Sequence, residues 1–207
     1  MNFNKRKIKL NIGSGSRPLK GYVNIDFDSI HNLKKRYPSK KFAKNLKIEN
    51  YNIFKLPFED DTVDEVRAEA FIEHLSFVEE KKFFYEVKRI LKSGGKINFS
   101  TVDFEKTILK WLHIKDDWKD FYSTSKKSIS KKHWFGTYTY DYKNRWGYIV
   151  ASIFGSQNGK GQYHKNCYSR KKLIAISKKI NFHKTKITNF RWQKKRDYMI
   201  RLISYKK

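Results

Sequence analysis

Two glycines and an aspartate near the start of the chain have the types and spacing of a ligand-binding site. The apolar run 8–12 stops at Gly13-Ser14-Gly15, and the next apolar run, 22–25, ends on Asp26. Glycines after a strand let the backbone turn sharply and approach a ligand without an intervening Cβ. A carboxylate at the tip of the next strand can accept hydrogen bonds from both hydroxyls of a ribose. The spacing predicts a nucleoside held across the carboxyl ends of two neighbouring parallel strands.

The elements that must position these residues alternate between strand and helix. Apolar runs predict strands at 48–54, 63–70 and 96–101 after the first two, with helices at 29–37 and 76–91 between them. Ser76 and Glu79 have the spacing of a capping box at the start of the second helix, and Gly94-Gly95 is typical of a left-handed stop after it. The alternation predicts an α/β fold with a mostly parallel sheet. A helix at 169–179 and an antiparallel hairpin of strands 185–192 and 197–204 complete it.

The chain is predicted to be one domain, residues 1–207. It divides into a cofactor-binding half (8–103), an insertion or lid (104–165), and a C-terminal helix and hairpin (166–207). Only six residues separate Gly15 from Tyr22, whereas a parallel crossover usually needs about a dozen or more, so the first crossover is shortened. The insertion is helical at both ends and holds four of the five tryptophans. Its rings either pack a small lid core or stack on a base or sugar.

The order of these motifs resembles the class I S-adenosylmethionine-dependent methyltransferases. The turn 56–64 (LPFEDDTVD) and the helix-and-glycine segment 87–97 (VKRILKSGGKI) follow the glycine loop and the strand-ending aspartate. Within that class the chain is similar to methyltransferase type 11-like and predicted sugar-cluster enzymes. The resemblance implies a Rossmann-like, seven-stranded sheet closed by an antiparallel C-terminal hairpin. It also implies S-adenosyl-L-methionine as the cofactor and methyl transfer as the reaction.

The resemblance also assigns a cofactor site, residue by residue. The glycine loop would lie against the methionine part of the cofactor, whose carboxylate a forked guanidinium can bind in a bidentate way. The strand-ending acid would hold the ribose, the end of the third strand would lie beside the adenine, and the end of the fourth would line the methionyl side. These positions are, in that order, Gly13, Ser14, Gly15, Arg17, Asp26, Asn52, Ile53, Glu69 and Ala70.

Three further side chains are candidates for the chemistry itself, because an acceptor that loses a proton on methylation needs a base. His74 follows the fourth predicted strand and has a near-neutral pKa; the alternative is that it braces the next helix. His164 is the second candidate base, and the alternative is a surface histidine. Asp103 would contact the substrate from the end of the fifth strand, or cap the next helix. Cys167 is the one cysteine, which excludes a Cys-rich zinc site, so no metal is expected.

The net charge of the chain, and its uneven distribution, indicate which classes of methyl acceptor it would attract. The chain has a formal net charge of +27, with 21 basic and 14 acidic side chains in residues 1–103 but 26 basic and 6 acidic in residues 104–207. Such a field attracts polyanions, although an AT-rich genome would produce the same excess of lysine. The leading acceptor is a sugar, a surface-glycan precursor or another small molecule. The alternatives are an RNA methyltransferase and a basic, non-catalytic binding protein that keeps the fold.

Location is predicted from what the sequence lacks. No apolar stretch approaches the roughly 20 residues that span a bilayer, and residues 1–9 are basic without the apolar segment of a signal peptide. A cytoplasmic protein is therefore expected, with peripheral contact to an anionic membrane left open. The oligomeric state is also left open.

Overall fold

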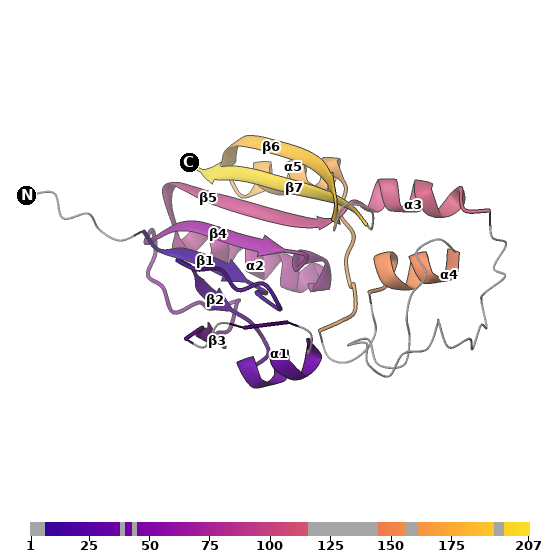
Figure 1. Ribbon diagram of the computed structural model, residues 1–207. Coiled ribbons are helices and arrows are strands. Elements are labelled where there is room, and N and C mark those ends of the chain that lie inside the picture. Colours follow the sequence, from indigo (N-terminus) through magenta and orange to yellow (C-terminus); the bar gives the residue numbers. More distant parts are fainter. Residues whose placement is uncertain (1–6, 38–39, 43–44, 116–144, 156–160, 193–196) are drawn as a thin grey trace, which may run out of the picture.

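One mixed sheet organises the molecule. The structure is a computed structural model that describes residues 7–37, 40–42, 45–115, 145–155, 161–192 and 197–207. Its strands are β1 (Lys9–Ile12), β2 (Val23–Ile25), β3 (Ile48–Glu49), β4 (Val63–Glu69), β5 (Leu91–Val102), β6 (Phe182–Arg191) and β7 (Tyr198–Lys206). They form a seven-stranded sheet in the order β3-β2-β1-β4-β5-β7-β6 (Figure 1). β1 to β5 are parallel and β7 is antiparallel to both of its neighbours, which confirms the predicted Rossmann-like fold.

The helical segments flank this sheet and its carboxyl edge. They are α1 (Ile30–Arg36), the 3₁₀ turn η1 (Ile72–His74), α2 (Phe77–Ile90), α3 (Phe104–Leu112), α4 (Arg145–Tyr148), the π-helical η2 (Ile149–Ile153) and α5 (Arg170–Lys179). α2 and α5 lie on the same face of the sheet, whereas α3 and α4 lie beyond the ends of the strands (Figure 1). None of the helices in the described ranges is long and apolar enough to cross a membrane.

Helix α2 forms as its sequence predicts and supplies much of the core. The Ser76 hydroxyl accepts from the Glu79 amide at 3.3 Å, while the Ser76 amide donates to the Glu79 carboxylate at 2.7 Å, which completes the capping box. Phe83 and Phe84 are fully buried, and each ring centroid lies 5.7 Å from that of Phe99 on β5. This aromatic contact fixes α2 against the centre of the sheet.

Three local expectations were wrong. β3 ends at Glu49 and not at residue 54, because the Asn50 side chain donates to the Asp26 and Phe27 carbonyls and turns the chain away. β5 begins at Leu91 and not at residue 96, because α2 ends at Ile90 and the chain enters the strand directly. Gly94 does have a positive φ of 74°, but it lies within β5, where the pairing with β4 is irregular, and does not terminate the helix.

The shortened first crossover contains no helix, as the sequence predicts. Residues 13–22 instead form a loop that polar side chains of β1 and β2 hold to the sheet. The Asn24 side chain accepts from the Leu19 amide at 2.7 Å and donates to the Leu19 carbonyl at 3.0 Å. Asn11 donates to the Asn24 carboxamide oxygen at 2.9 Å. Two asparagines therefore replace a crossover helix.

The ends of the expected insertion, 104–165, are helical. α3 follows β5, and α4 continues into η2. Residues 116–144, which hold most of the insertion's aromatic side chains, lie outside the described residues. The proposed boundaries within the domain therefore stay predictions.

Candidate active site

The glycine loop and Asp26 form one hydrogen-bonded unit at the carboxyl ends of β1 and β2. Gly13 and Gly15 have φ values of 64° and 49°, which favour glycine. The Gly15 amide donates to Asp26 Oδ2 at 2.7 Å, and the Asp28 amide donates to Asp26 Oδ1 at 2.9 Å. Burial raises the pKa of Asp26, and the two amide donors oppose this shift. The carboxylate is held beneath the loop, where the sequence places it.

The loop has room and an unused polar group for a ligand. The Ser14 hydroxyl is buried and has no hydrogen-bond partner among the described residues. A Cβ added to Gly15 would meet only the Tyr37 hydroxyl at 3.7 Å and the Gly13 carbonyl at 3.9 Å. Tyr37, at the end of α1, therefore faces the loop from the other side. These features fit the sugar and methionyl parts of a nucleoside cofactor.

An arginine cluster surrounds Glu69 at the end of β4. Arg67 forms a close ion pair with Glu69, and the Arg17 and Arg201 guanidinium groups lie 3.8 and 4.0 Å from its carboxylate. Arg17 also stacks over Trp192, 3.9 Å from the ring centroid. Desolvation by burial lowers the pKa of both Arg17 and Arg67. The Arg17 guanidinium, which the resemblance predicts will bind the cofactor carboxylate, contacts the Glu69 carboxylate in this structure.

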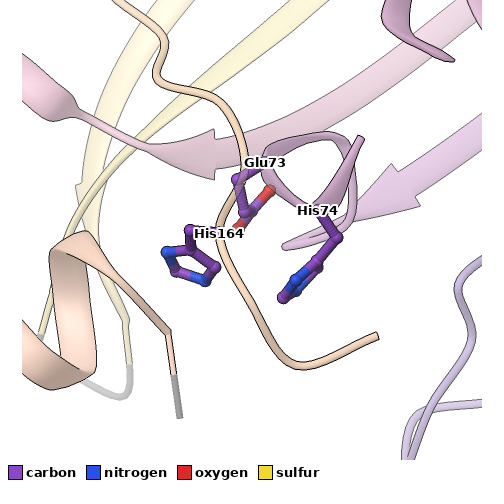
Figure 2. A group of neighbouring side chains, drawn as sticks. All are labelled: Glu73, His74 and His164. Carbon is purple, nitrogen blue, oxygen red and sulfur yellow. The ribbon is translucent and has the colours of Figure 1, made fainter. Parts of the chain in front are cut away.

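A second group of side chains, Glu73, His74 and His164, forms what we call the Glu-His-His cluster. Glu73 and His74 belong to η1, directly after β4, whereas His164 lies on the segment 161–168 that follows η2 (Figure 2). The ring centroids of His74 and His164 are 4.9 Å apart. One nitrogen or carboxylate oxygen from each of the three residues lies within 4.8 Å of the others.

Backbone contacts hold the two halves of this cluster together. The Lys165 and Asn166 amides donate to the Glu73 carbonyl at 2.8 and 3.2 Å. The Tyr168 hydroxyl, whose side chain is fully buried, donates to the Ile72 carbonyl at 3.2 Å. The segment 161–168 is therefore fastened to η1 along its length, which fixes His164 beside His74.

Burial determines the protonation of the cluster. Burial raises the pKa of Glu73 to about 7. It lowers the pKa of His74, and burial together with the neighbouring His74 lowers the pKa of His164 to about 3. Both imidazoles are therefore neutral at pH 7.

Comparisons with known proteins address the family. Residues 13–99 match the model of a family described as a methyltransferase domain. An S-adenosylmethionine-dependent methyltransferase from Methanosarcina mazei superposes with a TM-score of 0.56 at 16% identity, over 99% of this chain and 94% of that one. One from Archaeoglobus fulgidus superposes with a TM-score of 0.57 at 11% identity, over 99% and 88%. None of the curated proteins that were compared matches the sequence.

The structural likeness shows the fold of the whole chain, and the family match identifies a methyltransferase domain over residues 13–99. The chain has the fold of the class I S-adenosylmethionine-dependent methyltransferases. This confirms the resemblance that the sequence predicts at the level of the class. The finer assignment to a sugar-cluster group stays a prediction.

The predicted residues of this methyltransferase are not all gathered in one place. Asn52 and Ile53 lie in the loop after β3, where the exposed Asn52 accepts from the Phe54 amide at 2.9 Å. Asp103 is the N-cap of α3 and accepts from the Lys106 amide at 3.2 Å and the Asn189 carboxamide at 2.7 Å. The roles of the first two at the adenine and of Asp103 at the substrate stay predictions.

The sequence presents the two histidines as separate candidate bases, and no motif links either Glu73 or His74 to His164. Their convergence depends on the path of the segment 161–168, for which no local motif gives a signal. Phe71, whose ring lies against Gly13, was also missed. The only hint in the sequence was its place at the end of the fourth predicted strand, beside Ala70.

Proposed function

We propose that this methyltransferase holds S-adenosylmethionine at the carboxyl ends of β1, β2 and β4. From there it transfers the methyl group to an oxygen or nitrogen of a sugar, a surface-glycan precursor or another small molecule. The observation that carries the cofactor site is the position of Asp26, 2.7 Å from the Gly15 amide. It joins the glycine loop to an acid at the end of the neighbouring strand, as a ribose site requires.

Asp26 has the capacity that such a role needs. Each of its oxygens accepts one backbone amide, and each keeps a further lone pair for a ribose hydroxyl. The unpartnered Ser14 hydroxyl is available to a polar group of the cofactor. When bound, the sulfonium supplies an electrophilic methyl group, and the chain supplies mainly proximity and alignment.

The Glu-His-His cluster supports a role in removing the acceptor's proton. It follows Phe71, which touches the glycine loop, and the His74 amide donates to the Phe71 carbonyl at 3.0 Å. With a pKa of about 3, His164 is a weak base, so the neutral imidazole of His74 is the better candidate to take a proton from an acceptor hydroxyl or amine during transfer. The cluster is therefore our proposed site of acceptor activation.

Cationic side chains near the same edge support an acceptor that carries phosphate. Arg191 stacks 3.8 Å from the Tyr198 ring centroid, and Arg201 stacks 4.7 Å from that of Phe190. Arg201 also lies beside Glu69 at the end of β4. Forked guanidinium groups bind phosphate well, so a nucleotide-linked or lipid-linked sugar phosphate fits this edge.

RNA is the second candidate acceptor. The observation that favours it is the charge of residues 104–207, with 26 basic and 6 acidic side chains, together with the stacked arginine–aromatic pairs of β6 and β7. The chain has no Asn/Asp-Pro-Pro-Tyr segment, the kind of segment with which amino-methylating enzymes grip a flipped base.

Two experiments test the proposal. Calorimetric titration of the purified protein with S-adenosylmethionine should give one site per chain, and no detectable binding at millimolar cofactor would overturn the proposal. Incubation with methyl-labelled cofactor and cell fractions should place label in the nucleotide-sugar or lipid-linked fraction. Label confined to the RNA fraction would replace the leading acceptor with the second.

A further inference from the structure

We propose that Glu73, His74 and His164 bind a divalent transition-metal ion, with Zn²⁺ as the representative, and that this ion activates a hydroxyl group of the methyl acceptor. The metal site stands on the geometry of the three side chains alone. Its use in activating the acceptor rests on the proposed function. This inference replaces the sequence expectation of no metal, which considered only cysteine ligands.

The donor set is the first argument. Two imidazoles and one carboxylate are a common three-residue ligand set for catalytic zinc. Ligand atoms at about 2.0–2.2 Å from a tetrahedral ion lie roughly 3.3 Å apart. One ligand atom from each of Glu73, His74 and His164 already lies within 4.8 Å of the others, so closing the site requires each pair to approach by at most about 1.5 Å.

The orientation of the imidazoles is the second argument. His74 Nδ1 lies 3.0 Å from the Tyr163 carbonyl, and His164 Nδ1 lies 3.2 Å from the Ser152 carbonyl. A carbonyl oxygen can only accept, so Nδ1 carries the proton in both rings and donates it. In a neutral imidazole the Nε2 lone pair is then bare. Histidine ligands of metals are usually fixed in this way by a carbonyl or carboxylate on their other nitrogen.

Glu73 is the third argument. Its side chain is only 2% exposed, and its Oε2 has no hydrogen bond of ordinary geometry among the described residues, although the Thr101 hydroxyl is close enough to the carboxyl to oppose the rise in its pKa. A buried carboxylate oxygen without a donor is costly. A cation between Glu73 and the two imidazoles would satisfy that oxygen (Figure 2).

The chemistry of the ligands selects the class of ion. Imidazole favours borderline transition metals, whereas Mg²⁺ prefers oxygen ligands and retains much of its water. Three protein ligands also leave at least one position open on a four-coordinate or five-coordinate ion. A hydroxyl of the acceptor, and not a further protein group, would occupy that position.

The reaction balances with the ion as a Lewis acid. The metal lowers the pKa of the coordinated hydroxyl, and the proton passes to water. The oxygen lone pair forms the new bond to the methyl carbon while the carbon–sulfur bond breaks and its electron pair stays on sulfur. The products are the methyl ether, S-adenosylhomocysteine and one proton, and nothing is oxidised or reduced.

Metal binding can be measured without an activity assay. The full-length protein, free of any histidine tag and stripped with a chelator, is titrated with Zn²⁺ by calorimetry and with Co²⁺ by visible absorption. We expect one ion per chain and a Co²⁺ ligand-field spectrum, with Mg²⁺ producing neither. His74→Ala and His164→Ala should each weaken Zn²⁺ binding at least about 100-fold, because each removes one of only three protein ligands.

His31→Ala is the matched control, because His31 lies exposed on α1, outside the cluster; it should bind Zn²⁺ as the wild type does. Thermal unfolding of each stripped variant checks that the fold survives, and His164→Asn serves as a second variant if the alanine variant does not fold. Absence of a stoichiometric site, or equal Zn²⁺ affinity in the wild type and in folded His74 and His164 variants, would overturn the proposal.

The role of the ion in methyl transfer has its own test. With an acceptor identified, activity should be lost on chelation and return with Zn²⁺ or Co²⁺, whereas an imidazole base would leave activity indifferent to chelators. S-Adenosylmethionine affinity, measured on the stripped protein, separates the two proposals. If the wild type binds Zn²⁺ but not S-adenosylmethionine, the proposed function is wrong and the metal site stands. If it binds S-adenosylmethionine but not Zn²⁺, the metal site is wrong and the proposed function stands.

Discussion

The ring of Phe71 lies directly against the backbone of Gly13. A Cβ added to Gly13 would come within 2.3 Å of Phe71 Cδ2. Because the backbone carbonyl of Phe71 also accepts from the His74 amide at 3.0 Å, one residue links the glycine loop, through its ring, to the Glu-His-His cluster, through its backbone. Gly13 is thus required both by its φ of 64° and by the packing of a residue 58 positions later.

Gly13→Ala should destabilise the protein strongly. Gly21 provides the matched control, since its φ is 80° but a Cβ added there would meet nothing within 4 Å. Gly21→Ala should cost about 1–2 kcal/mol from its backbone conformation alone. Gly13→Ala should cost at least roughly 1–3 kcal/mol more, the usual range for overpacking. Urea denaturation measures both, and equal losses would show that the contact with Phe71 is unimportant.

Asp26→Asn should weaken S-adenosylmethionine binding by about 10–100-fold, because hydrogen bonds to a charged group contribute roughly 1.5–3 kcal/mol. The asparagine retains one oxygen acceptor but loses the charge. Calorimetric titration measures the change. Glu59→Gln, an exposed position on the turn before β4, is the control and should bind the cofactor as the wild type does. Unchanged affinity in Asp26→Asn would place the ribose elsewhere.

Arg17→Lys should lower cofactor affinity about tenfold, as expected if a bidentate fork to the cofactor carboxylate is lost. The charge opposite Glu69 is kept, whereas the planar stack over Trp192 is lost. Arg170→Lys on α5, an exposed position, is the control for a generic effect of lysine. If both variants bind the cofactor equally well, Arg17 serves only the ion pair with Glu69.

Glu73 should make the metal-free protein less stable as pH rises. Its folded pKa, about 7, lies above its ordinary value of 4.5, so the folded state holds the proton more tightly than the unfolded state. Stability is therefore lost as pH rises from about 4.5 to 7. Glu73→Gln cannot ionise at this position and should not show this loss. Because the histidines titrate in both proteins, their contribution cancels in the comparison.

The measurement is the free energy of unfolding of the wild type minus that of Glu73→Gln, with a chelator present. From pH 4 to pH 8 this difference should fall by about 2–3 kcal/mol. A flat difference would mean that Glu73 ionises in the folded protein as easily as in the unfolded chain.

Much of the fold could be predicted because its signals are local. The capping box of Ser76 and Glu79, the Gly13–Gly15 loop and the alternating C-terminal hairpin all act within a few residues, and the structure contains each of them. An error such as the end of β3 has a non-local cause. The Asn50 side chain ends β3 early by bonding to backbone that follows β2, a contact between strands that periodicity does not register.

The sequence by itself determined the class of fold, the methyltransferase family and the pairing of a glycine loop with Asp26, because each depends on neighbours along the chain. Only the tertiary structure decided that Glu73 and His74 meet His164, about 90 residues later. That meeting requires the segment 161–168 to bond to η1 across the edge of the sheet. Burial there then shifts the pKa values of all three groups, and burial is a property of the packed chain that residue types and spacing do not encode.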